Sequence, residues 1–110
     1  MPFIRSPLLI EVAPELVAEL QRLLCQQGEF ALVDQVADLT LVDRCRCGDS
    51  FCSSFYTAPP PFGPYGPGHR TIPLSSDTGI LTMDVIASRI VHVEVLRRDD
   101  LRSKILAAFD

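Results

Sequence analysis

The chain lacks tryptophan, contains only 7% aromatic residues and has no long apolar run. A membrane-spanning helix requires roughly 20 consecutive apolar residues, and no stretch of the sequence approaches that length, so we expect no membrane partner. The first residues contain neither the apolar segment nor the small-residue cleavage site of a signal peptide, which favours a cytoplasmic location. With few rings available, leucine, isoleucine and valine must build the core.

Positive charge is scarce as well. The sequence has 10 lysines and arginines against 14 aspartates and glutamates, for a net charge of -4. The arginines that come closest to a cluster, Arg44/Arg46 and Arg97/Arg98, have aspartates beside them. A protein that holds nucleic acid neutralises the phosphates with a basic face. We therefore expect no nucleic-acid partner.

The N-terminal part of the chain is expected to be helical after an extended arm. Prolines within residues 1–12 favour the arm. Pro14 suits a first helical turn, and from there leucines and a valine recur at helical spacing until Gly28, a natural helix stop. Residues 29–38 suit a second, shorter helix.

The clearest element is a β-hairpin over residues 80–96. Apolar and polar side chains alternate along both of its strands, which predicts that each strand has one buried face. The polar faces match if Asp84 lies opposite His92 and Val85 opposite Val91, with a three-residue loop between the strands. Thr82 and Glu94 then complete a polar strip with that aspartate and histidine.

These patterns together predict one α+β domain over residues 1–110. Residues 39–57 suit two further strands around a cysteine-containing turn, and a last helix is expected from Asp99 or Asp100 onward. Because consecutive strands are joined by short turns, we expect an antiparallel sheet of four or five strands. One or two N-terminal helices and the C-terminal helix should pack on one face of this sheet.

Three cysteines within eight residues, Cys45, Cys47 and Cys52, form the first candidate site. A glycine-containing turn lets several sulfurs point to one place, as in a tetrahedral zinc site. The spacing, C-x-C followed by C-x₄-C, differs from that of zinc knuckles, and a fourth ligand has to come from elsewhere: His69 is the better candidate and Asp49 the poorer one. Buried structural cysteines and a redox-active pair are the alternatives.

Two short motifs carry a resemblance to known proteins. Residues 44–48 read RCRCG, and residues 93–96 read VEVL. Over residues 39–98 the chain resembles small uncharacterised bacterial proteins that have an R-C-x-C-G turn and a C-terminal hairpin strand of this kind. The resemblance implies a bacterial source and a domain of unknown function, and it brings no activity and no catalytic residues.

The second candidate site is a loop over residues 58–73, which contain six prolines and three glycines. We expect no regular structure there, because proline cannot donate to a ladder. Phe62, Tyr65 and His69 are candidates for binding a protein partner or a second copy of the chain. The alternative is that these rings tuck against the sheet.

The polar strip is the third candidate site. His92 with Asp84 or Glu94 has the groups for acid–base chemistry in a small enzyme, but the solvent face of a hairpin needs the same residues. The sequence contains no nucleophile elbow, phosphate loop or H-E-x-x-H motif, so we assign no catalytic residue. The leading hypothesis is a non-enzymatic interaction or accessory protein; a small zinc-binding domain is the alternative, and an enzyme the second alternative.

Overall fold

The computed structural model describes residues 6–109. Four α-helices form in this part of the chain: α1 (Leu9–Val12), α2 (Pro14–Gln26), α3 (Phe30–Val36) and α4 (Asp99–Ala107). The same residues contain five strands: β1 (Asp43–Arg44), β2 (Phe55–Tyr56), β3 (His69–Leu74), β4 (Ile80–Ile86) and β5 (Arg89–Leu96). None of the described helices has both the length and the apolar character needed to cross a membrane.

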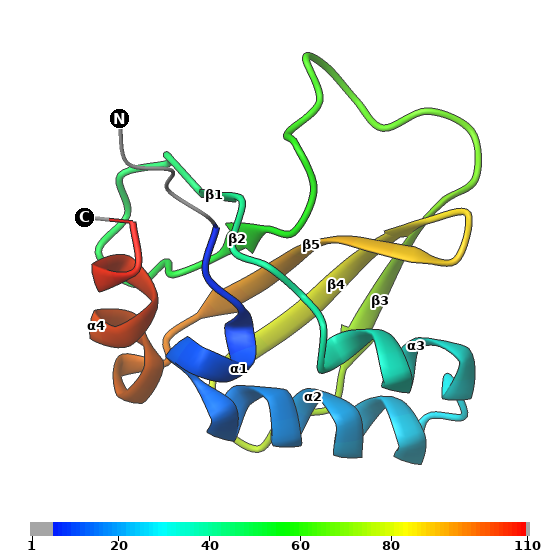
Figure 1. Ribbon diagram of the computed structural model, residues 1–110, viewed down its shortest axis with the longest axis horizontal. Coiled ribbons are helices and arrows are strands. Elements are labelled where there is room, and N and C mark those ends of the chain that lie inside the picture. The colour runs from blue at the N-terminus through cyan, green and yellow to red at the C-terminus, as the bar shows by residue number, and fades with distance from the viewer. Residues whose placement is uncertain (1–5, 110) are drawn as a thin grey trace.

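The strands form one antiparallel sheet in the order β1-β2-β5-β4-β3. Figure 1 shows α1, α2 and α3 along one face of the sheet, with α4 beside the end of β5. Apolar side chains from all four helices and from the inner face of the sheet meet in a single buried cluster. The predicted α+β class, antiparallel sheet and helix positions are confirmed.

Helix α2 forms as its pattern predicts. Pro14 stands in its first turn, where a missing amide hydrogen costs nothing, and Gly28 follows the helix with a φ of 79°. The helix buries one stripe of side chains against the sheet: Leu16, Val17, Leu20, Leu23 and Leu24.

The β4–β5 hairpin has the predicted polar pairs, with Asp84 opposite His92. The expected pairing of Val85 with Val91 is wrong, because Val85 lies opposite Ile90. The connection has two residues, Ala87 and Ser88, both at positive φ, a geometry that matches the twist of the flanking strands better than the expected three-residue loop. Val91 is then the extra residue of a β-bulge, which restores the predicted register beyond it.

The extended arm expected over residues 1–12 is wrong for Leu9–Val12, which form α1; residues 1–5 lie outside the described residues. Two interactions explain the helix. The carboxylate of Glu11 accepts a hydrogen bond from the Leu8 amide at 3.1 Å. The Leu9 amide donates to the Leu39 carbonyl at 2.8 Å, and its side chain is fully buried.

The irregular loop expected over residues 58–73 is shorter than predicted, because its last residues belong to β3. Proline is tolerated in this strand since β3 is the edge of the sheet, where a missing amide hydrogen leaves the ladder intact. Pro73 lies opposite Thr82 of β4. The remaining proline- and glycine-rich segment, residues 58–68, extends beyond the sheet in Figure 1 and is called the proline loop below.

Arg98 fixes the position of α4. Its buried guanidinium donates to both carboxylate oxygens of Glu19 on α2, at 3.0 and 2.8 Å, and also pairs with Asp100 at 3.0 Å. Bidentate pairs of this kind fix orientation as well as distance. The start of α4 is thereby fastened to α2, at the end of the sheet where β5 finishes.

We predict that Gly79→Ala strongly destabilises the fold. Gly79 has a φ of 67°, and a Cβ atom there would lie 2.4 Å from the Leu96 carbonyl oxygen and 2.9 Å from that of Arg97. Strain of this kind costs about 1–3 kcal/mol, and the clash adds to it, so urea unfolding should show a loss of about 2 kcal/mol or more. Gly63→Ala is the control, because its Cβ would meet nothing within 4 Å. Equal stability of the two variants would contradict the prediction.

Candidate functional site

The cysteine turn connects β1 to β2 and is anchored at both ends. The Cys45 amide donates to the Ser54 carbonyl at 2.9 Å, which continues the β1–β2 pairing by one residue. Cys52 forms an isolated bridge with Leu96 at the end of β5. Between these anchors Gly48 takes a φ of 81°, which a residue with a side chain rarely adopts. The backbone therefore returns on itself, and the cysteines face a common centre.

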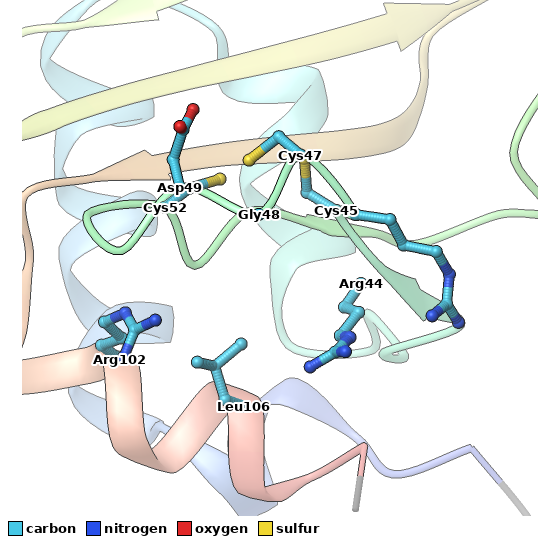
Figure 2. A pocket seen from close by; sticks show the side chains of 9 residues that line it. Arg44, Cys45, Cys47, Gly48, Asp49, Cys52, Arg102 and Leu106 are labelled. Carbon is cyan, nitrogen blue, oxygen red and sulfur yellow. The ribbon is translucent and has the colours of Figure 1, made fainter.

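The sulfur atoms of Cys45, Cys47 and Cys52 all lie within 4.8 Å of one another. Figure 2 shows them turned toward one another, and they are free thiols. Cys45 and Cys52 therefore approach each other across the turn. In a tetrahedral site with metal–sulfur bonds of about 2.3 Å the sulfurs stand roughly 3.8 Å apart. Closing the three sulfurs around an ion therefore requires only small side-chain movements.

The ionisation of Cys45 and that of Cys52 depend on each other. Burial raises the pKa of the Cys45 thiol to about 11, and hydrogen bonds to Cys47 and Cys52 favour its protonated form further. Burial also opposes ionisation of Cys52, but hydrogen bonds with Ser54 and with the other two thiols outweigh it and lower the pKa of Cys52 below its usual value. Cys52 is thus the sulfur that the turn favours as a thiolate, which is the form that binds metals.

The side chain of Ser54 links Cys52 to β5. Its hydroxyl lies 3.4 Å from the Cys52 sulfur and accepts a hydrogen bond from the Val95 amide at 2.8 Å. The hydroxyl is buried, so its position is fixed by β5 rather than by solvent. Ser54 is a support that sequence analysis missed, although it lies two residues from a predicted ligand.

A cavity of about 190 Å³ opens beside the sulfurs. Besides the cysteines it is lined by arginines from three segments and by Leu106 of α4; the arginines are Arg44, Arg46 and Arg102. Arg46 pairs with Asp43 at 2.9 Å. The guanidinium of Arg102 has its Nε atom shielded from solvent without a hydrogen-bond partner. The site therefore combines three soft sulfur ligands with a positively charged wall.

The prediction of His69 as a fourth ligand is wrong. His69 begins β3, whereas the cysteine turn follows β1, and these strands are the two edges of the sheet. Three strands separate them, which the sequence could not reveal because it did not fix the order of the strands. Asp49 does line the cavity, but within the described residues the group of converging ligand atoms consists of the three sulfurs alone.

His69 instead joins the polar strip on the outer face of the sheet. Its Nε2 atom lies 2.8 Å from one oxygen of Asp84, and Nδ1 of His92 lies 3.1 Å from the other. Thr71 donates a further hydrogen bond to Asp84 at 2.9 Å. Sequence alternation along β3, which places His69 and Thr71 on one face, is the signal that could have identified this cluster. Because both oxygens of Asp84 are occupied, the cluster suits a structural link better than acid–base catalysis.

The proline loop is anchored to this cluster at one point and exposed at another. The ring of Tyr65 lies on that of His69, with centroids 4.7 Å apart, and burial followed by the charge of Asp84 raises the pKa of Tyr65 to about 12. Phe62 has a relative exposure of 112%, so its ring touches almost nothing. The three predicted contact residues thus divide into an anchored pair and one exposed ring.

Comparison with known proteins adds no relative: no protein-family model, curated protein or solved structure matches the chain. What the protein does is therefore inferred from the geometry of its own residues.

We predict that Asp84→Asn lowers stability at neutral pH by about 1–3 kcal/mol, because it leaves hydrogen-bonded groups without their charged acceptor. Burial opposes ionisation of Asp84, but hydrogen bonds from His69, Thr71 and His92 bring its pKa below the ordinary 3.8. A depressed pKa stabilises the fold above pH 3.8 and loses that contribution as the pH falls through the folded value.

The measurement is urea unfolding from neutral to acidic pH, with the exposed Asp77 changed to Asn as a control. The gap between wild type and Asp84→Asn should narrow below pH 3.8. A gap that stays constant into acid would show that Asp84 acts by packing alone.

Proposed function

We propose that the protein binds one thiophilic metal ion, zinc in the first place, through Cys45, Cys47 and Cys52. The observation that carries the proposal is the convergence of three free thiols within 4.8 Å of one another on a single turn. Zinc and copper(I) prefer sulfur ligands, and zinc accepts three protein ligands with an exchangeable fourth. Binding releases the remaining thiol protons, so affinity should rise with pH.

The surroundings favour an ion with this ligand set. Three thiolates around a divalent ion leave the centre negatively charged, and Arg44 and Arg102 line the same cavity. Cys45 and Cys52 are half-buried and Cys47 is exposed, so an ion reaches the site from one side. The ligands must be reduced, which agrees with the cytoplasmic location predicted from the sequence. The bacterial source stays a prediction from the resemblance.

A second candidate function is the binding of a protein partner through the proline loop. Phe62 is the observation that favours it, because a wholly exposed phenylalanine forgoes about 1.5–3 kcal/mol of burial. The contact of Tyr65 with His69 holds the loop at its base, and its prolines restrict the backbone. A loop held in shape before contact loses little entropy on binding. The accessory role predicted from the sequence would then rest on this exposed ring.

Metal content and affinity test the first function. Protein purified without chelator should contain stoichiometric zinc, and Cys47→Ser should weaken zinc binding by at least about 100-fold, because it removes a direct ligand. Cys25→Ser is the matched control, since Cys25 is an exposed free thiol on α2 outside the cluster. Elemental analysis and competition with a chromophoric chelator provide the readout. Metal-free protein with no affinity for added zinc would refute the proposal.

Separate variants of the two rings test the second function. Phe62→Ala should change stability by less than about 0.5 kcal/mol and should weaken self-association or partner binding. Tyr65→Ala should lower the melting temperature, because it removes a half-buried ring that contacts His69. Thermal unfolding and sedimentation velocity over a range of concentrations measure both effects. A Phe62→Ala variant as unstable as Tyr65→Ala would place Phe62 in the protomer's own packing.

A further inference from the structure

The arginines that line the cavity beside the sulfurs differ in their ion pairing from arginines elsewhere in the fold. Elsewhere, Arg70 and Arg98 each form bidentate pairs with a glutamate. In the cavity only Arg46 has an ion pair; within residues 6–109 the structure gives none to Arg44 or Arg102. Two unpaired guanidinium groups thus line one small cavity of a protein whose net charge is -4.

Arg102 gives the clearest sign that an acceptor is missing. Its Nε atom is shielded from water and has no hydrogen-bond partner. Buried polar atoms in folded proteins are nearly always hydrogen-bonded, so this guanidinium, whose residue lines the cavity, lacks an acceptor that such a group normally has. Figure 2 shows Arg102 and Arg44 on one side of the cavity, with the sulfurs of the cysteine turn across from them. Both groups therefore line the space that an anion in the cavity would occupy.

A metal ion held by the three thiols would bind a further ligand in the same cavity. Zinc bound by three sulfurs has a fourth coordination position. His69 lies on the opposite edge of the sheet, and the carboxylate of Asp49 is not part of the converging group. A soft ion favours sulfur in that position, and a guanidinium matches the two oxygens of a carboxylate. The volume of about 190 Å³ suits a small molecule.

We propose that the cavity binds a small thiol that carries a carboxylate, with its sulfur on the metal and its carboxylate on Arg102 and Arg44. The inference rests on the proposed metal site. On binding, the thiol gives its proton to solvent, a metal–sulfur bond forms, and the water that held the fourth position leaves. The guanidinium groups offset the negative charge that the added thiolate brings to the centre.

The experiment uses the full chain loaded with cobalt(II), whose thiolate charge-transfer and d–d bands report the ligand set. 3-Mercaptopropionate should bind at least about tenfold more tightly than the neutral 2-mercaptoethanol, as expected for a charge-assisted hydrogen bond. Propionate, which lacks sulfur, should leave the charge-transfer bands unchanged. Arg102→Gln should reduce the preference to less than about threefold without changing the cobalt stoichiometry. Arg89→Gln, an exposed arginine outside this cavity, should keep the preference.

Different results would contradict the inference and the metal site on which it rests. If cobalt binds stoichiometrically but the two thiols bind equally well, or if Arg102→Gln keeps the preference, the inference is overturned and the metal site stands. If inorganic phosphate competes as well as 3-mercaptopropionate and no new sulfur band appears, the cavity binds oxyanions and the thiol assignment is wrong. If cobalt does not bind, the metal site and the inference both fail. Arg102→Lys, which keeps the charge, should keep part of the preference and guards against a folding defect in Arg102→Gln.

Discussion

The pairing of residues 51–57 with β5 is the interaction on which the rest of the molecule depends. The Arg97 amide donates to the Phe51 carbonyl at 2.8 Å, the Ser53 amide to the Val95 carbonyl at 2.9 Å and the Thr57 amide to the Val91 carbonyl at 3.0 Å. Phe55, which is fully buried, lies opposite Val93 between these bonds. The ladder ties the cysteine turn to the central strand, and α4 follows that strand directly. Arg102 and the sulfurs become neighbours for this reason.

The same strand connects the two polar clusters of the molecule. Near its end, Cys52 bridges to Leu96, and Ser54 holds the Val95 amide. Closer to its start, His92 contacts Asp84 and the ring of Tyr56, whose centroid is 4.6 Å away. The thiols and the imidazole of His92 are thus held at separate positions along β5. This separation lets the proposed metal site and the loop anchor coexist in a small domain.

Hydrophobic periodicity predicted most of the fold, because each helix and each alternating strand buries one face. It placed α2 and the polar pairs of the hairpin, but it could not show the bulge at Val91, which depends on the turn geometry. For the site, the glycine-containing turn was enough to predict that the sulfurs could converge. Arg102 was not predicted as part of the cavity wall, because it lies 50 residues from Cys52 in the sequence. Its spacing of four from Leu106 does place these two residues on one helix face. The order of the strands, which excludes His69, has no local signal.

The ladder between residues 51–57 and β5 also determines when the three thiols converge during folding. Its partners are more than 30 residues apart in the sequence, and during synthesis the cysteines emerge well before the strand that supports them. Contacts of such separation form late, because the chain between them must close first. Until β5 has been made and has paired, the Ser54 hydroxyl and the Cys52 end of the turn lack their partners on that strand. The newly made chain therefore carries three unorganised thiols, and their convergence comes with the completed sheet.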